Sequence, residues 1–401
     1  NVEVASIAYF DFDGMVDVRV ISNKERVNSV RVRPLSYKIT PDCVGDTVTF
    51  SLSRPRNLSV EVNGDIFHNL HLFANPIDKF RPSDKEIQRA LKKKKGSNLI
   101  YFGPGVHNLP NDTLFVPSGT TVYIDGGARV YGNIFTEGAH DVNIFGRGEV
   151  HPDGRGAGVW VRRSKNVRID GIVVSQLPIG QCDSVELTNV KSISYYGWGD
   201  GMDVFSSSNV ILDGVFCRNS DDCAAVYAST QGFKGGSNNV LVKNATLWAD
   251  VAHPINIGGH GDPNGMDTVQ NVTFRNIDIL DQAEKQIDYQ GCLAINPGDN
   301  TLVRNITFEN IRIEDFRNGQ LVNFRISFNP KYCVSTGRGI QNVLVKDVTY
   351  NGSGENLSII AGYDENHKIS GIRFVNLVVN GRKITDDMPG KPKWYKTGDM
   401  A

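Results

Sequence analysis

The sequence predicts an all-β protein in which a right-handed parallel β-helix is preceded by a small N-terminal β-sandwich. The main reason is a repeat: from about residue 99 onward, strand-like segments with alternating apolar positions recur. Such segments start at residues 166, 184, 209, 239, 271, 305, 342 and 371, so that their spacing is 18 to 37 residues. An Asn or Asp also recurs at the same step inside them. A period in this range with a fixed internal pattern is typical of solenoids whose coils stack on a continuous core.

The first 78 residues have a different pattern, which predicts the sandwich. Residues 16–20 and 48–52 alternate apolar and polar side chains with a period of two, as half-buried strands do. Residues 58–62 are followed by Asn63 and Gly64, a signal for a hairpin turn. We therefore expect residues 1–78 to form an antiparallel domain of their own.

Residues 79–98 interrupt both patterns and are expected to form a linker with one short helix. Ser83 and Glu86 have the spacing of a capping box, and Ile87 and Leu91 follow at helical spacing. The four lysines at residues 92–95 fit an exposed helix end, because cations favour the negative end of the helix dipole. The β-helix domain is then expected over residues 99–401.

The asparagines that recur in the repeats are interpreted as structural. Asn accepts the left-handed backbone conformation that tight turns require, and its side chain can bond to a neighbouring coil. The residues concerned are Asn189, Asn244, Asn276, Asn310 and Asn376.

Composition argues against several classes of partner. The chain has 43 Lys and Arg against 44 Asp and Glu, a net charge of -1, so nothing favours electrostatic binding of nucleic acid or of an anionic membrane. No apolar run approaches the roughly 20 residues of a membrane span, and no signal peptide is recognisable at Asn1. We expect a mature protein that is secreted or periplasmic.

The six cysteines lack metal-site spacing, so buried free thiols are expected and no metal or cofactor is predicted. The oligomeric state stays open.

Three carboxylates are separated by about one coil of the predicted solenoid. Asp200 precedes Asp221 and Asp222 by 21 residues, and neighbouring coils lie about 4.8 Å apart, so the three side chains are expected on one face. Carboxylates this close repel one another, and at least one should keep its proton near neutral pH. Such a group suits glycosidic cleavage, in which one carboxyl protonates the leaving oxygen and another activates water. The alternative is that these residues only cap turns or bind calcium.

Three motifs in order resemble the active sites of the inverting β-helix glycoside hydrolases, namely family 28 (polygalacturonases) and family 49 (dextranases and isopullulanases). They are Gly-Asp-Gly-Met-Asp at 199–203, Asn-Ser-Asp-Asp-Cys at 219–223 and Ala-His-Pro-Ile-Asn-Ile-Gly-Gly at 252–259. The resemblance implies that Asp221 is the general acid, that Asp200 and Asp222 hold and deprotonate the attacking water, and that His253 orients or tunes the acid. An inverting pair needs a separation of about 6.5–9.5 Å, which side chains on two coils are expected to reach.

One departure from the resemblance concerns the substrate. Polygalacturonases carry an Arg-Ile-Lys stretch after the histidine to bind the uronate carboxylate, whereas residues 291–295 here read Gly-Cys-Leu-Ala-Ile. Together with a leading sandwich similar to that of family 49, this slightly favours a neutral α-glucan of the dextran or pullulan type, with polygalacturonase action on pectin as the alternative. Lys285 or Arg325 would substitute for the missing cations.

Further residues are candidates for contacts with a polysaccharide or oligosaccharide. Trp198, Tyr227 and Trp248 offer rings that stack on sugar faces, and His260 is expected in a subsite beyond the strand that follows His253. Two functions of other classes remain open. One is a polysaccharide lyase, which would need a basic residue and calcium, and the other is a non-catalytic glycan-binding solenoid.

Overall fold

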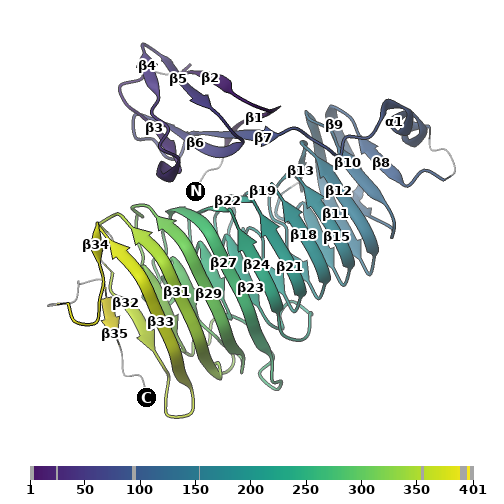
Figure 1. The fold of residues 1–401 in the computed structure, drawn as a ribbon. Helices are drawn as coiled ribbons and strands as arrows, with labels where there is room; N and C mark the ends of the chain where they lie inside the picture. The colour runs from purple at the N-terminus through teal and green to yellow at the C-terminus, as the bar shows by residue number, and fades with distance from the viewer. Residues whose placement is uncertain are drawn as a thin grey trace. The chain divides into compact units, whose positions relative to one another are not determined.

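The computed structural model describes residues 4–23, 26–92, 96–152, 154–353, 356–388 and 395–397. The chain divides into two compact units, Asn1–Arg81 and Pro82–Ala401, which are traced in Figure 1. Three of the four lysines expected at the helix end, residues 93–95, lie outside the described residues.

The N-terminal unit consists of two small sheets around one apolar core. One sheet has the order β1-β7-β6-β3 and the other the order β2-β5-β4. The shared core contains Val48, Leu58 and Val60. β1 pairs with β7 in parallel, so the expectation of a wholly antiparallel unit is wrong at this one pairing. The elements are β1 (Ser6–Phe12), β2 (Val16–Ile21), β3 (Val30–Arg33), the short 3-10 helix η1 (Leu35–Tyr37), β4 (Asp42–Val44), β5 (Thr47–Leu52), β6 (Arg56–Val62) and β7 (Leu70–Pro76).

The expected short helix begins the second unit as α1 (Asp84–Leu91). The Ser83 hydroxyl accepts the backbone N–H of Glu86, and the Glu86 carboxylate accepts the backbone N–H of Ser83 at 2.9 Å. This reciprocal capping box satisfies two of the helix's free N–H groups. Ile87 is its buried residue.

The rest of the second unit is the predicted parallel β-helix, whose strands form three columns (Figure 1). The first column begins with β8 (Leu99–Phe102), β10 (Thr121–Ile124), β12 (His140–Gly146), β15 (Lys165–Asp170), β18 (Asp183–Thr188), β21 (Ser208–Asp213) and β24 (Asn238–Lys243). The second contains β13 (Glu149–His151), β16 (Val173–Val174), β19 (Lys191–Ile193), β22 (Phe216–Asn219) and β25 (Thr246–Ala249). The third contains β14 (Val159–Arg162), β17 (Ile179–Gly180), β20 (Val204–Phe205), β23 (Ala224–Tyr227), β26 (Ile255–Ile257), β28 (Leu293–Ile295), β30 (Val322–Arg325), β32 (Ser358–Ala361) and β35 (Tyr395–Thr397).

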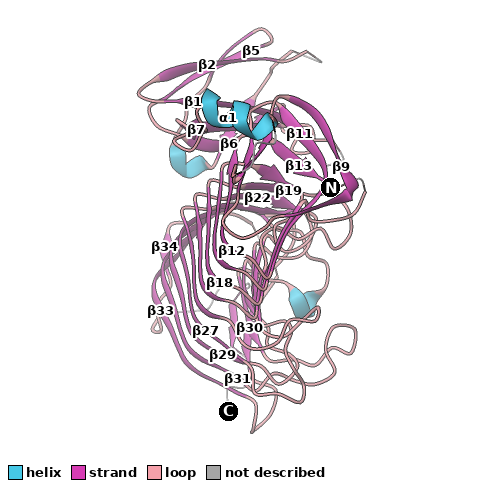
Figure 2. Cartoon of the chain, turned by 90° about the vertical axis from the view of Figure 1, so that its right-hand side faces the viewer, coloured by secondary structure: helices cyan, strands magenta, loops and turns pink. Residues whose placement is uncertain are grey.

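Longer strands pass from one column into the next. They are β9 (Gly105–Phe115) and β11 (Ala128–Glu137) at the start, and β27 (Thr268–Asp281), β29 (Leu302–Ile313), β31 (Gly339–Tyr350) and β33 (Lys368–Val379) later. The remaining elements are the 3-10 helix η2 (Ile287–Tyr289) and β34 (Arg382–Lys383). Figure 2 shows the longer loops, with η2 among them, gathered on one side of the β-helix next to β30.

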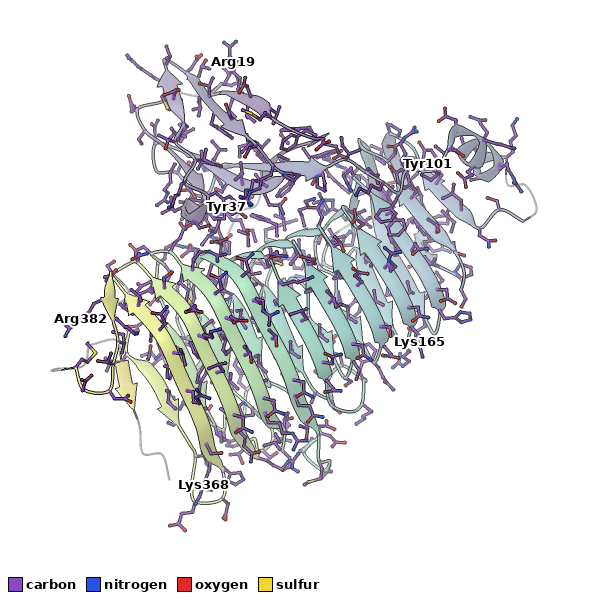
Figure 3. The ribbon with its side chains drawn as sticks, viewed as in Figure 1. Arg19, Tyr37, Tyr101, Lys165, Lys368 and Arg382 are labelled. Atoms are coloured by element: carbon purple, nitrogen blue, oxygen red, sulfur yellow. The ribbon has the colours of Figure 1, made fainter. Side chains whose placement is uncertain are left out.

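In-register stacking of apolar side chains fills the interior. Val185 pairs with Val210, and Val210 pairs with Val240; all three are buried in one continuous core. Aromatic residues extend this packing, as where Phe274 and Phe308 stack with ring centroids 5.9 Å apart. Lys165 and Lys368, which begin β15 and β33, lie along the lower edge of the β-helix in Figure 3.

The repeated asparagines have the predicted structural role. Asn244, Asn276 and Asn310 all have a positive φ of 55 to 57°. Their amides form a ladder, because Asn276 donates to Asn244 at 2.7 Å and Asn310 donates to Asn276 at 3.3 Å. The prediction that these residues turn the chain and bond to the next coil is confirmed.

The cysteines are free thiols, and all except Cys43 are buried. This matches the expectation of thiols that pack as small apolar side chains. Within the residues that the structure describes, no helix has the length and apolar character needed to cross a membrane.

Candidate active site

Equivalent turns of three successive coils carry the four candidate catalytic residues. Asp200 lies between β19 and β20, Asp221 and Asp222 between β22 and β23, and His253 between β25 and β26. Backbone bonds fix the register of these turns: Gly201 N–H donates to the Asp222 carbonyl and Cys223 N–H donates to the His253 carbonyl, each at 2.8 Å. The β-helix therefore brings together residues that are up to 53 positions apart in the sequence.

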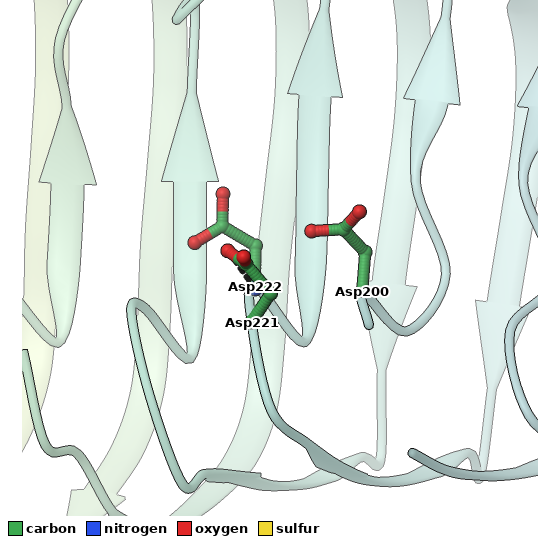
Figure 4. A group of neighbouring side chains, drawn as sticks. All are labelled: Asp200, Asp221 and Asp222. Atoms are coloured by element: carbon green, nitrogen blue, oxygen red, sulfur yellow. Dashed lines mark hydrogen bonds between the residues drawn. The ribbon is translucent and has the colours of Figure 1, made fainter. Parts of the chain in front are cut away.

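The three aspartates form a compact cluster (Figure 4). One carboxylate oxygen of each lies within 4.8 Å of the others. The coil spacing of about 4.8 Å brings Asp200 directly against the Asp221–Asp222 pair. The separation of about 6.5–9.5 Å expected for an inverting pair refers to whole carboxyl groups rather than to their nearest oxygens, and for these residues it stays a prediction.

Small residues and one buried amide allow this close packing. A Cβ at Gly199 would overlap the Ser220 hydroxyl, and a Cβ at Gly201 would overlap the Cys223 carbonyl. Asn219 is fully buried, and its Nδ2 donates to the Asp200 carbonyl at 3.0 Å and to the Ser194 hydroxyl at 2.9 Å. Glycine on both sides of Asp200 therefore serves the contact between coils.

Asp222 is held by three neighbours. The Nδ1 atom of His253 lies 2.7 Å from Oδ1 of Asp222, and the backbone N–H of His253 donates to the same oxygen at 3.1 Å. The Tyr227 hydroxyl donates to Oδ2 at 2.6 Å, and Asn256 Nδ2 donates to Oδ2 at 2.9 Å. The hydrogen-bond partner of His253 is thus Asp222, whereas the sequence predicted that this histidine would act on the acid Asp221.

These contacts favour the charged forms of both Asp222 and His253. Burial by itself would raise the pKa of Asp222, but His253 and the donors of Tyr227 and Asn256 lower it below the usual carboxyl value. Burial by itself would lower the pKa of His253, but the Asp222 carboxylate raises it. Asp222 and His253 therefore form an anion–cation pair.

The other two aspartates, Asp221 and Asp200, favour the protonated form. Burial, with repulsion from Asp222 and then Asp200, raises the pKa of Asp221 to about 8. Burial, with repulsion from Asp222, raises the pKa of Asp200 to about 7. Near neutral pH the site thus combines a protonated carboxyl with an ionised one, as acid-base cleavage requires.

Carboxylate oxygens are also the ligands that calcium prefers. Both oxygens of Asp222, however, already accept hydrogen bonds from His253, Tyr227 and Asn256. The donor set therefore fits an anion–imidazole pair better than a cage of oxygens around a cation.

A cavity of about 420 Å³ opens beside the cluster toward the earlier coils. Asp200, Asp203 and Trp198 line it, together with Trp160 and Arg155. Carbohydrate sites combine aromatic faces with a few polar groups in this way.

The three predicted stacking rings have different surroundings. Trp198 is 64% exposed and lies at the cavity, so its face is accessible. Trp248 is 0% exposed, and the Arg218 guanidinium covers its ring at 3.8 Å from the centroid; the prediction that Trp248 binds substrate is wrong, because its side of β25 is enclosed. Tyr227 is 7% exposed and stacks on Phe205. Its predicted role as a sugar platform is therefore wrong, although its hydroxyl belongs to the cluster.

The three polar residues predicted to contact the substrate lie on different elements. His260 lies against Tyr227, with ring centroids 5.0 Å apart, and so is adjacent to the site. Lys285 is exposed in the connection between β27 and β28. Arg325 ends β30 and is partly exposed.

Strand β28 shows what replaces the basic pair of polygalacturonases. Leu293 and Ile295 belong to the core, so Ala294 and Asn296 take the alternating outer positions. Ala294 pairs with Asn256, which contacts Asp222. The outer position on this strand, Ala294, and the one directly after it, Asn296, are therefore uncharged.

The sequence analysis did not predict two residues that lie next to the three aspartates. Asp203 is buried, and burial with repulsion from Asp200, Asp222 and Asp221 raises its pKa well above the usual value. Asn256 is the second. Both lie within the quoted motifs, and a register model of the coils would have placed them on the outer face of the third column.

Comparison with known proteins agrees with this geometry. The sequence profile of Glycosyl hydrolases family 28 matches residues 159–388, more than half of the chain. A "Polygalacturonase" of Juniperus ashei is 26% identical over 295 residues, which cover 65% of this chain and 54% of that protein. An "Exopolygalacturonase" of Cochliobolus carbonum is 24% identical over 53% of this chain and 52% of its own length. The chain thus spans about half the length of the curated relatives it matches.

Among solved structures, Dex49A from Penicillium minioluteum aligns with 95% of this chain and 79% of its own, with a TM-score of 0.58 at 15% identity. This likeness concerns the fold alone. The profile match includes all three aspartates and His253, and by that match the chain belongs to glycosyl hydrolases family 28.

Proposed function

We propose that this chain hydrolyses the α-linked galacturonan of pectin, with inversion at the anomeric carbon. The observation that carries the proposal is the pairing of a protonated carboxyl, Asp221, with an ionised one, Asp222, within one cluster. Similarity to polygalacturonases supports the polymer. The preference for a neutral α-glucan, which the sequence slightly favoured, has no support from these relatives.

The proposed reaction is a single displacement. Asp221 gives its proton to the glycosidic oxygen as the bond from that oxygen to the anomeric carbon breaks. A water molecule held by Asp200 and Asp222 attacks the anomeric carbon from the opposite face, and one of these carboxylates takes its proton. His253, Tyr227 and Asn256 keep Asp222 ionised and fixed for this step.

A galacturonan also needs a cation for its carboxylates, and we propose Lys331 for this role. Its Nζ donates to the Tyr332 hydroxyl at 2.7 Å. This bond raises the pKa of Lys331, with smaller contributions from the carboxylates of Glu284 and Asp221. Because the charge of Asp221 contributes to this pKa, we infer that the ammonium faces the proposed acid, and we propose that it binds a uronate there.

A neutral α-glucan is the second candidate, favoured by the uncharged outer positions Ala294 and Asn296. The two are separated by incubating the protein with polygalacturonate, dextran and pullulan and following the anomers of the first product by NMR. Release of inverted galacturonides supports the proposal. Hydrolysis of dextran or pullulan alone would overturn the substrate, and a retained anomer would overturn the direct attack by water.

A further inference from the structure

One loop crosses from one edge of the third strand column to the other. In a parallel sheet the strand starts lie along one edge and the strand ends along the opposite edge. Trp198 precedes β20 and Tyr289 precedes β28, so both belong to the edge of strand starts. Tyr332 follows β30 and so leaves from the edge of strand ends.

Tyr332 nevertheless contacts the opposite edge. Its ring packs against Tyr289 and Trp198, with centroid distances of 5.1 and 6.5 Å. Its hydroxyl donates to Oε1 of Gln286 at 3.1 Å. Residues 327–336, which we name the strap, therefore reach across the outer face of the sheet through the Tyr332 side chain.

Hydrogen bonds of residues 333–335 anchor the strap. The Asp299 carboxylate accepts the backbone N–H of Val334 at 2.8 Å and that of Ser335 at 3.3 Å. The Cys333 thiol, which is buried, donates to the Gly259 carbonyl at 3.3 Å. Because Gly259 follows β26 and Asp299 follows β28, these bonds fix the backbone of the strap at the edge of strand ends, while the Tyr332 side chain reaches the opposite edge.

The position of the crossing relative to the aspartates decides its consequence. Trp198 belongs to the coil of Asp200, whereas Gln286 and Tyr289 precede β28, two strands after the Asp221 coil in the third column. The Tyr332 side chain thus joins the coil of Asp200 to the connection before β28, with the coils of Asp221 and His253 between them. The 420 Å³ cavity opens on the other side of Asp200.

We propose that the strap closes the substrate site at the three aspartates on the side of the later coils, so that the enzyme takes the ends of polysaccharide chains and releases one or two sugars at a time. This inference rests on the proposed function. Tyr332 is then the residue that determines exo rather than endo attack, because it joins the strap to the opposite edge.

The test compares the loss of viscosity with the release of reducing ends on polygalacturonate, dextran and pullulan, with early products separated by chromatography. For the wild-type chain we expect one short product from the start and little loss of viscosity. Tyr332→Ala, and a variant with residues 328–330 replaced by one glycine, which keeps Lys331, should raise the viscosity loss per bond cleaved at least 5-fold and yield longer oligomers. Val334→Ala, an exposed side chain on the same strap, is the matched control and should behave as the wild type.

The outcomes separate the two proposals. Rapid loss of viscosity with mixed oligomers from the wild type, or an unchanged product pattern in both strap variants, would overturn the strap inference while leaving galacturonan hydrolysis intact. Release of short products from dextran or pullulan, but not from polygalacturonate, would overturn the proposed substrate and support the strap.

Discussion

The imidazole of His253 is paired with Asp222, its Nδ1 lying 2.7 Å from Oδ1 of that carboxylate. The pair is buried, and the low dielectric constant of the interior strengthens the attraction between the two charges. Asp222 stays ionised as a result, and its charge helps to keep the proton on Asp221. One histidine thus separates the protonation states of two adjacent residues.

Removal of the proposed acid should abolish most of the turnover. Asp221→Asn is expected to lower kcat by about 10²-fold or more on the cleaved polymer, in the range of general acid catalysis. Asp200→Asn and Asp222→Asn should each cost a similar factor. Steady-state kinetics with circular dichroism as a check of folding measures this, and near-normal turnover of Asp221→Asn would refute its role.

Stability should fall as the pH rises through the neutral range. The folded chain raises the pKa of Asp221 to about 8 and that of Asp200 to about 7, from a usual value of about 4. Between a pH of about 4 and a pH of about 8, the folded state binds more protons than the unfolded state. The free energy of unfolding therefore decreases as the pH rises. Asp221→Asn should therefore raise Tm at pH 8 by roughly 1–3 °C and have much less effect at pH 4. Equal shifts in calorimetry at both pH values would contradict this.

Loss of the Tyr227 hydroxyl should change the acidic limb of the pH profile. Tyr227→Phe removes one of the donors to Oδ2 of Asp222, so the pKa of Asp222 should rise. The fall of kcat at low pH would then begin at a higher pH than in the wild type, while kcat at the optimum falls less than in Asp222→Asn. An acidic limb that does not move would show that the hydroxyl has no part in holding the charge.

The two tryptophans that looked alike in the sequence should respond differently to substitution. Trp198→Ala is expected to raise KM several-fold with little change in Tm, because the ring is exposed beside the cavity. Trp248→Ala should lower the free energy of unfolding by about 3–5 kcal/mol, as for other buried aromatic residues. Thermal unfolding and KM measured on both variants check the contrast, which would fail if Trp248→Ala were as stable as the wild type.

Substitution of Lys331 should raise KM for a charged galacturonan but not for its uncharged methyl ester. Lys331→Met is expected to raise KM for polygalacturonate by about 10-fold, the loss of one charge-assisted contact, and to leave KM for methyl-esterified pectin nearly unchanged. Lys331→Arg should restore much of the difference. Equal effects of Lys331→Met on both polymers would mean that the ammonium does not bind a carboxylate.

Local sequence patterns were sufficient for the β-helix and for the order of the motifs. Alternating apolar positions and the left-handed asparagines, such as Asn244 and Asn276, act within a few residues, and each coil repeats them. The spacing of one coil between Asp200 and Asp221 likewise predicted that the aspartates meet.

Only the tertiary structure decided whether a side chain is enclosed or exposed, and which side chain of another coil it contacts. Trp248 is enclosed by Arg218 from the previous coil, and His253 pairs with Asp222 because the register of two turns brings them together. The crossing of Tyr332 to Gln286 joins loops that are 46 residues apart. The sequence by itself determined which residues repeat, because periodicity is local; only the stacking of coils of unequal length decided which side chains meet, because a contact between coils depends on every residue between them.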